Sequence, residues 1–441
     1  MNAAITQAEL QDFRHSFLSD RTNLLAMNAV CANGVNQASR QYDTVRRAEH
    51  EYSLSLEQHG ITFQKSSGRC WMFSGFNILR DRVIRRLDLE NFAFSGNHLM
   101  FYDKLEKANF FLEEILAHLD EPSDSRMLMT LMRGVRSDGG EWEMFVSLVK
   151  KYGLVPQSAQ PETVSTDDSR AMAPVVVEKL REFARDLRRG HATGKTISEL
   201  RAEKEDMLRT VYKMYCICYG EPVKTFDFKA RSKKGEFICA RNITPLEFFR
   251  TYVDVDLDEY VDLVCGSSGG SELKKFRFPD EGNVIGGKDV SYVSVPVKTL
   301  KRAAIAQLKD GEPVWFGCDV GERCWREGGI LDDTLYGYES LFSTPFQMER
   351  RDRFDYRQAS MSHAMTFKGV DLNVQGDPLW WRVENSWGED AGKKGMFIMS
   401  DGWFEKYTYQ VIIHRRYLPE NILQVYDGDE VTDLKKWQPH I

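Results

Sequence analysis

A cysteine, a histidine and two carboxamides occupy sequence positions that suit thiol chemistry. Cys70 ends the stretch Gln64-Lys-Ser-Ser-Gly-Arg-Cys70, His363 follows a serine, and Asn385 precedes Ser-Trp-Gly. The thiolate is the nucleophilic form of a cysteine, and a free thiol keeps its proton up to a pKa of about 8.5. A facing imidazole can take that proton, and a carboxamide can orient the imidazole. These residue types together predict acyl transfer with Cys70 as the nucleophile, His363 as general base and acid, and Asn385 as the orienting group.

Gln64 lies six residues before Cys70 and supplies a second carboxamide. Its side-chain N–H₂ and the backbone N–H of Cys70 could both donate to the oxyanion that forms during acyl transfer. The alternative is that Cys70 is a small buried side chain and Gln64 a surface residue, because free cysteines are often buried and inert. The glutamine, histidine and asparagine segments occur together, which favours the catalytic interpretation.

The residues after Cys70 predict a helix that begins at the thiol. Apolar side chains recur at spacings of three and four from Phe73 to Leu87, while arginines fall on the opposite face. The positive end of a helix dipole favours a thiolate at the first helical position. We therefore expect this helix to present Cys70 with part of its charge stabilised by the backbone.

Two strands are expected to carry the other catalytic groups. Residues 364–370 have the apolar and β-branched content of a strand, so His363 would stand at its start. Residues 380–384 predict the next strand, with Asn385 at its end. Trp387 is expected to cover the hydrogen bond between the imidazole and the carboxamide.

Longer blocks of sequence carry a resemblance to a known family. They are residues 68–73 (GRCWMF), 137–144 (SDGGEWEM), 313–320 (PVWFGCDV), 361–365 (MSHAM) and the Asn385 segment. On these blocks, spread over about residues 60–420, the chain resembles papain-type cysteine peptidases, and within them the bleomycin hydrolase and aminopeptidase C family.

The resemblance implies a fold, an activity and roles for residues. The fold would be α+β, a papain-like two-lobe cysteine peptidase fold with a helical lobe, an antiparallel β-barrel-like lobe and a large helical insertion. The activity would be that of an aminopeptidase acting on peptides, with no metal or other cofactor, and with Cys70, His363, Asn385 and Gln64 in the roles given above. Gly139 and Gly140 match the main-chain segment that pairs with an extended substrate, and glycines do allow such close approach. The alternative is a plain turn before a helix over residues 142–152.

The spacing of the catalytic residues indicates an insertion between the lobes. Cys70 and His363 are 293 positions apart, beyond the roughly 130 to 150 of compact members of the group. Helical periodicity around residues 177–187 and a capping box from Thr196 to Glu199 predict two helices there. The expected organisation is a lead segment 1–59 that packs on the core, a helical lobe 60–160 with the nucleophile, an inserted helical region 161–285, a β lobe 286–425 with His363 and Asn385, and a C-terminal arm 426–441. The resemblance implies that the inserted region is a hook-like projection used for oligomerisation, and the alternative is a lid or an added domain on a monomer.

The C-terminal arm bears on where a peptide is cut. In the resembling family the final carboxylate meets the free ammonium of the substrate and restricts the enzyme to amino-terminal residues. Trp437 and Pro439 match that arm, but the small residues normally beyond them are absent, so the arm is expected to be about four residues short. An aminopeptidase is the favoured activity, and endopeptidase or dipeptide-releasing action is the alternative.

Composition bears on compartment and partners. No run of about 18 apolar residues occurs, and eight cysteines in 441 residues do not form an evident disulfide framework. We therefore expect a cytoplasmic protein without membrane attachment. The resemblance implies a homo-oligomer, a hexamer. A nucleic-acid-binding assembly protein is the alternative of another class, because lysines and arginines cluster within residues 179–234, but a net charge of −7 opposes general affinity for polyanions.

Overall fold

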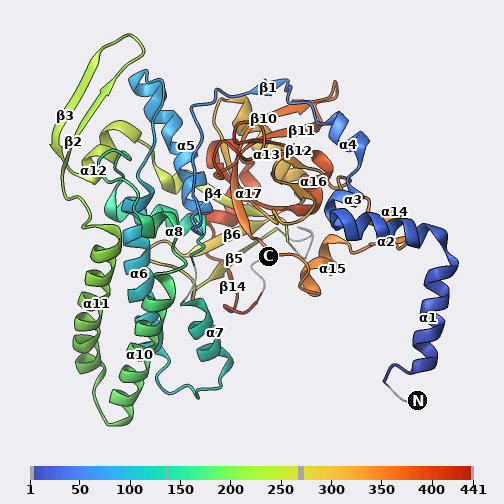
Figure 1. Ribbon diagram of the computed structural model, residues 1–441. Coiled ribbons are helices and arrows are strands. Elements are labelled where there is room, and N and C mark those ends of the chain that lie inside the picture. Colours follow the sequence, from blue (N-terminus) through green and yellow to red (C-terminus); the bar gives the residue numbers. More distant parts are fainter. Residues whose placement is uncertain (1–3, 136–137, 267–272, 439–441) are drawn as a thin grey trace.

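The computed structural model describes residues 4–135, 138–266 and 273–438. Helices gather on one side of the molecule and a large twisted sheet lies on the other (Figure 1). The helical side carries Cys70, and the sheet carries His363 with Asn385 directly after one of its strands. The predicted α+β class, with a helical lobe, a β lobe and a helical insertion, is confirmed.

Helix α5 forms the centre of the helical lobe. The helices of this lobe are α5 (Cys70–Leu87), α6 (Gly96–Ala117), α7 (Arg126–Gly134) and α8 (Trp142–Tyr152). Trp71, Met72 and Phe76 of α5 are buried, and the ring of Phe76 meets that of Phe145 on α8 edge to face, with centroids 5.8 Å apart. The helices predicted to begin at Cys70 and to span residues 142–152 are both present.

The β lobe is built on one long sheet. Its strand order is β14-β5-β6-β4-β13-β7-β10-β11-β12-β9-β8, with β1 paired to β10 beside this path. The strands are β1 (Leu54–Ser55), β4 (Tyr260–Val264), β5 (Lys274–Phe278), β6 (Val290–Ser294), β7 (Val314–Cys318), β8 (Cys324–Trp325), β9 (Ile330–Leu331), β10 (His363–Leu372), β11 (Pro378–Glu384), β12 (Met396–Ser400), β13 (Thr408–His414) and β14 (Thr432–Asp433). Most neighbours are antiparallel, whereas β4 with β6, β9 with β12, and β5 with β14 are parallel.

Helices and one 3₁₀ turn connect the strands of this sheet. They are α13 (Val297–Lys309), α14 (Tyr338–Phe342), α15 (Arg350–Asp355), α16 (Asp401–Tyr407), α17 (Glu420–Asp427) and the 3₁₀ turn η3 (Arg415–Tyr417). Of these, α13, α16 and α17 pack against the sheet. The core beneath them is apolar, and Phe316, Phe367 and Trp381 are fully buried in it. This packed core makes β7, β10 and β11 a rigid support for the residues at their ends.

The strand pairing brings His363 and Asn385 to one edge of the β lobe. On β10, His363 lies opposite Cys318 of β7, and Thr366 lies opposite Glu384 of β11. Asn385, the next residue, is therefore placed at the His363 end of β10. The two strands predicted to position these side chains are thus found, with this register.

Four buried charged side chains join α5 to the β lobe. Arg80 donates to Glu384, and Lys368 donates to Asp81, with Lys368 Nζ also 3.6 Å from a Glu384 oxygen. All four side chains are at most 8% exposed. Because removing one partner would leave a buried charge unpaired, this network fixes α5 against β10 and β11.

The inserted region adds a helical projection and a small hairpin. Its elements are α9 (Val164–Asp167), α10 (Ala173–Ala192), α11 (Ile197–Tyr219), β2 (Phe226–Arg231), β3 (Phe237–Ile243), α12 (Pro245–Phe248), the π-helical turn η1 (Phe249–Val253) and the 3₁₀ turn η2 (Leu257–Glu259). Thr196 and Glu199 form the predicted capping box of α11. β4 and β5, which come after this projection, pair within the main sheet. The division of the chain into five segments stays a prediction.

Four helices form the N-terminal segment. They are α1 (Gln7–Ser19), α2 (Arg21–Asn33), α3 (Val35–Ser39) and α4 (Tyr42–Arg47). Of these, α1 extends away from the body (Figure 1), and α3 and α4 pack against the β lobe through the buried side chains of Ser39 and Thr44. Neither α1 nor α2 has a buried residue. Among the helices of the described residues, none has the length and apolar character required to cross a membrane.

Candidate active site

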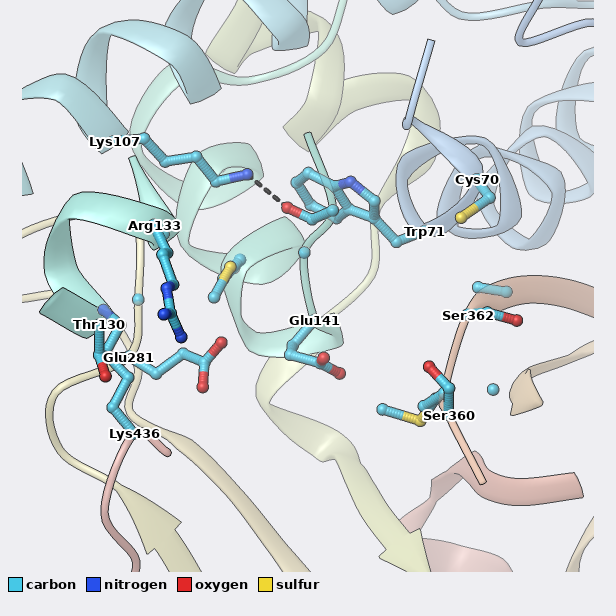
Figure 2. A pocket seen from close by; sticks show the side chains of 18 of the residues that line it. Cys70, Trp71, Lys107, Thr130, Arg133, Glu141, Glu281, Ser360, Ser362 and Lys436 are labelled. Carbon is cyan, nitrogen blue, oxygen red and sulfur yellow. Dashed lines mark hydrogen bonds between the residues drawn. The ribbon is translucent and has the colours of Figure 1, made fainter. Parts of the chain in front are cut away.

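Cys70 and His363 line the same cavity, of about 700 Å³, between the two lobes. The helical lobe contributes Cys70 and Trp71 from α5 and the segment 139–141, and the β lobe contributes residues 359–364. Figure 2 shows Cys70 beside Ser362, the residue before the histidine, with Glu141 farther along the cavity. The structure therefore brings together two residues separated by most of the chain.

A chain of hydrogen bonds links the histidine to both carboxamides. His363 Nε2 lies 2.9 Å from Asn385 Oδ1, which also accepts from the backbone N–H of Ser386 at 2.8 Å. The Ser386 hydroxyl donates to Gln64 Oε1 at 2.7 Å. With its Nε2 side held by Asn385, His363 has Nδ1 available for the thiol. The carbonyl of Asn385 can act only as an acceptor, so it fixes the ring with the proton on Nε2.

The side chain of Gln64 is oriented from both ends. Its Oε1 accepts from Ser386, and its Nε2 donates to the carbonyl of Ser67 at 2.7 Å. One of the two N–H bonds of Nε2 is used in that contact, which leaves the second for an oxyanion. No side chain of the described residues caps α5, whose N-cap is Arg69, so the backbone N–H of Cys70 can also serve an oxyanion.

Trp387 packs against the imidazole as expected. The two ring centroids are 4.9 Å apart. The guanidinium of Arg326 lies over the ring of Trp387, 4.8 Å from its centroid. His363 is 7% exposed and Asn385 fully buried, so the hydrogen bond between them is shielded from water.

Burial acts against the charged form of each reacting group. It raises the pKa of the Cys70 thiol, although the backbone N–H groups of Ala364 and Trp71 lower that pKa in part. It also lowers the pKa of His363 to about 4, against the raising effect of the Asn385 hydrogen bond. A lone thiolate or a lone imidazolium is therefore disfavoured. Transfer of the proton from Cys70 to His363 creates the two charges side by side, where each stabilises the other.

The glycine pair forms the cavity wall next to Trp71. Lys107 Nζ donates to the carbonyl of Gly139 at 2.5 Å (Figure 2), which holds this segment in place. Lys107 Nζ also donates to Asp103 at 3.0 Å. A Cβ on Gly140 would lie only 2.7 Å from the ring of Trp71. The packing of Trp71 is thus a reason for glycine here that is separate from the expected approach of a substrate backbone.

The C-terminal arm borders the other end of the cavity. Lys436 lines it and donates to the carbonyl of Asp280 at 2.8 Å, and the ring of Trp437 lies 5.0 Å from the guanidinium of Arg126. Figure 2 shows Lys436 beside Thr130 and Glu281, away from Cys70. The predicted shortness of the arm concerns its last residues, and 439–441 lie outside the described residues.

Two supporting residues were not identified from the sequence. Arg69 is buried, and its guanidinium binds Glu162 at 2.9 Å, the carbonyl of Thr166 at 2.8 Å and the hydroxyl of Ser67 at 2.8 Å, which anchors the loop before the thiol. Ser386 connects the two carboxamides. Arg69 directly precedes Cys70 and Ser386 directly follows Asn385. This adjacency to predicted catalytic residues is the sequence signal that could have identified them. Across the described ranges, no group of three or more His, Cys, Asp or Glu side chains is arranged to hold a metal ion.

Comparisons with known proteins agree over the full length. The model of the Peptidase C1-like family matches residues 4–440. Aminopeptidase C of Lactobacillus delbrueckii subsp. lactis is 35% identical, covering 100% of this chain and 98% of its own. Bleomycin hydrolase of Homo sapiens is 36% identical, covering 96% and 94%. The crystal structure of PepW from Lactobacillus rhamnosis HN001 has a TM-score of 0.97 at 37% identity, covering 100% and 99%. The chain belongs to the Peptidase C1-like family.

Proposed function

We propose that this protein is a cysteine-type aminopeptidase that removes residues from the amino terminus of peptides. The observation that carries the proposal is the shared cavity of Cys70 and His363, with Asn385 bonded to the far side of the imidazole. Relatives with full-length similarity are named aminopeptidase C, aminopeptidase G and bleomycin hydrolase. These names favour neither an endopeptidase nor a nucleic-acid-binding protein.

The site supplies every group that the reaction needs for its first step. The sulfur of Cys70 attacks the scissile carbonyl carbon as its proton passes to Nδ1 of His363. The carbonyl oxygen becomes an oxyanion, to which Gln64 Nε2 and the Cys70 backbone N–H donate. When the tetrahedral intermediate collapses, the C–N bond breaks and His363 protonates the departing amine. A thioester on Cys70 remains.

Water completes the cycle. His363 takes a proton from a water molecule as its oxygen attacks the thioester carbonyl, and the same two donors hold the second oxyanion. Collapse breaks the C–S bond, releases the carboxylic acid product and returns the proton to the sulfur. Asn385 acts through the imidazole alone, because it touches His363 and Ser386 and not the reacting atoms.

Activity on paired peptides tests the proposal. The wild-type chain is expected to cleave a peptide with a free amino terminus and to lose most of that rate when the same peptide is acetylated. Replacement of the nucleophile, Cys70→Ser, should reduce kcat/KM by at least about a thousandfold, because a serine hydroxyl is a far weaker nucleophile under these conditions. The matched control is Cys31→Ser, which removes an exposed free thiol on α2 and should leave the rate unchanged. Full activity of Cys70→Ser contradicts the catalytic assignment, and an undiminished rate on the acetylated peptide contradicts exopeptidase action.

We also propose that the protein works in the cytoplasm as a homo-oligomer, the hexamer that the resemblance implies. All eight cysteines are free thiols, which fits a reducing compartment. Helix α1 exposes Leu10, Phe13 and Phe17, a set that suits contact with another copy. Recovery of the activity with a cytoplasmic marker on cell fractionation supports the location, and recovery with a secreted or membrane fraction contradicts it.

A further inference from the structure

The amine that leaves in the reaction lies against the imidazole, because His363 protonates it. When the substrate is a dipeptide, this amine belongs to the second residue. The carboxylate carbon of that residue is two bonds from the amine nitrogen, about 2.5 Å away given bonds of about 1.5 Å. A protein group that binds the carboxylate must therefore lie a short distance from His363, on the side where the amine departs.

Arg326 lies at such a distance from the imidazole. The imidazole of His363 and the guanidinium of Arg326 are 4.9 Å and 4.8 Å from the ring of Trp387, so both contact the same indole. His363 lines the cavity between the lobes, and Trp387 contacts it from outside that lining. An amino acid bonded through its amine to an imidazole and through its carboxylate to a guanidinium spans up to about 10 Å between these two groups. The two contacts with Trp387 keep Arg326 within that span.

The backbone of Arg326 is fixed against the loop that follows Trp387. Arg326 lies in the turn between β8 and β9, and its carbonyl accepts from the N–H groups of Gly329 at 3.3 Å and Gly392 at 3.0 Å. A Cβ on Gly329 would lie only 2.6 Å from Cα of Gly392, so the turn and the loop pack backbone to backbone. This packing and the contact with the indole restrict where the guanidinium can lie.

The guanidinium of Arg326 has donors available for a ligand. Within the described ranges its side chain forms no hydrogen bond and no ion pair, even with the adjacent Glu327. The contact with Trp387 uses none of the five N–H groups. Arg326 is exposed and lines an open groove of about 610 Å³ beside the junction of α2 and α3, so a carboxylate can approach from solvent. Two N–H groups of a guanidinium match the two oxygens of a carboxylate.

We propose that Arg326 binds the α-carboxylate of the leaving residue and thereby favours dipeptides over longer peptides. This inference rests on the proposed aminopeptidase function and adds a preference for substrate length to it. In a longer peptide an uncharged amide occupies the position of this carboxylate, and the groove leaves room for the chain to continue. Arg326 would therefore favour short substrates without excluding long ones.

The charge of Arg326 also acts on the imidazole. Burial chiefly, and Arg326 in addition, lowers the pKa of His363. A bound carboxylate would offset the charge of Arg326 and so make the imidazole a better proton acceptor. Carboxylate binding would then assist the transfer of the proton from Cys70 as well as orient the leaving residue.

The test compares four proteins on three peptides. The proteins are the wild type, Arg326→Gln, Arg326→Lys and the matched control Arg357→Gln, which removes another exposed arginine, one that lines the cavity. The peptides are leucyl-alanine, leucyl-alanine amide and leucyl-alanyl-alanine, and the release of leucine is followed by chromatography. All three share the scissile bond and the free amino terminus, so a general change in the nucleophile cancels in the ratio of their kcat/KM values.

The expected result is a change of ratio caused by one residue. The wild type should prefer leucyl-alanine to its amide, and Arg326→Gln should reduce this ratio by about fivefold to tenfold, between the effect of an exposed ion pair and that of a hydrogen bond to a charged group. Arg326→Lys should fall between the two, because it keeps the charge and loses the paired donors. Arg357→Gln should keep the wild-type ratio. The rate on leucyl-alanyl-alanine should change less than about twofold in every variant, because its carboxylate lies one residue farther away.

Two further measurements separate binding from damage to the site. Loss of the positive charge of Arg326 raises the pKa of His363, so alkylation of Cys70 by iodoacetamide at neutral pH should not slow in Arg326→Gln. The wild-type preference for leucyl-alanine should weaken as salt is raised from about 0.05 to about 0.5 M, whereas the ratio of Arg326→Gln should not respond.

Other outcomes overturn the inference. An unchanged ratio in Arg326→Gln, or an equal loss in Arg357→Gln, assigns the carboxylate to another group. A loss confined to leucyl-alanyl-alanine shows that Arg326 binds farther along the peptide. The aminopeptidase function is judged separately with acetyl-leucyl-alanine amide. If the wild type cleaves this peptide as fast as leucyl-alanine amide, that function fails, whatever the ratio shows for Arg326.

Discussion

The charge on the sulfur of Cys70 is decided by the groups that surround it in the fold. Burial and the carboxylate of Glu141 raise the pKa of the thiol, whereas the N–H groups of Ala364 and Trp71 lower it. His363 is affected in the opposite direction, since burial lowers its pKa to about 4. Formation of the thiolate at neutral pH therefore depends more on the neighbouring imidazole, which accepts the proton, than on the backbone N–H groups at the start of α5.

This dependence predicts the pH profile of a variant. In His363→Ala the thiol keeps the burial that raises its pKa and loses the group that takes its proton. A raised pKa means less thiolate at any given pH, so alkylation of Cys70 at pH 7 should slow, and the midpoint of its pH dependence should move above about 8.5, the value of a free cysteine. Iodoacetamide kinetics from pH 5 to 10 measure this, with Cys31→Ser as the background. An unchanged midpoint would show that the helix and the backbone N–H groups suffice.

Ser386 offers a separate test of the oxyanion assignment. Ser386→Ala removes the donor to Gln64 Oε1 and leaves the side chains of Cys70, His363 and Asn385 in place. Gln64 would then be less firmly oriented, so kcat should fall by about tenfold, against about a hundredfold or more for Gln64→Ala. Alkylation of Cys70 should be unaffected in both variants, because the oxyanion donors do not act on the resting thiol. A slower alkylation would place Ser386 in the activation of the nucleophile.

The side chains proposed as catalytic could be selected from the sequence because each has a recognisable neighbourhood, and the residues that support them could not. Cys70, His363, Asn385 and Gln64 follow from residue type and short motifs. The hydrogen bond from Ser386 to Gln64 joins residues 322 positions apart, and no local pattern encodes such a pairing. Glu141 lay within a recognised block, but only the fold shows that its carboxylate faces the cavity.

At the scale of elements, the ion network between α5 and the β lobe carries a prediction about stability. Lys368→Met leaves Asp81 without its buried cation and should reduce the free energy of unfolding by about 3–5 kcal/mol. Guanidinium unfolding followed by tryptophan fluorescence measures the change. The control is Lys406→Met, which removes an exposed lysine paired with Asp333 in the same lobe and should have a far smaller effect. Equal effects of the two variants would exclude the network as the main link between the lobes.

The elements themselves followed closely from sequence periodicity, and their pairing did not. The starts of α5 and α11 and the bounds of α8 matched the predictions, because apolar spacing and a capping box are local signals. The insertion of β4 and β5 into the main sheet depends on partners such as β13, more than 100 residues away. Nothing in the short stretch 260–278 specifies that partner.

At the scale of the molecule, the N-terminal helices leave an apolar surface that this chain does not cover. Leu10, Phe13 and Phe17 lie at helical spacing on one face of α1 and are 47%, 55% and 39% exposed. Burial of a phenylalanine side chain contributes roughly 1.5–3 kcal/mol, so covering this face is a strong driving force for association.

The double variant Phe13→Ser, Phe17→Ser should therefore weaken assembly while leaving each subunit folded, because α1 has no buried residue within the chain. Light scattering after size exclusion should show a smaller species than the wild type at the same concentration. Circular dichroism and the alkylation rate of Cys70 report whether the fold and the site are retained. Serine substitution of Val374, an isolated exposed side chain elsewhere, is the control and should not change the mass. If the double variant keeps the wild-type mass, this face of α1 does not hold the proposed oligomer together, and the projection formed by α10 and α11 is the next surface to test.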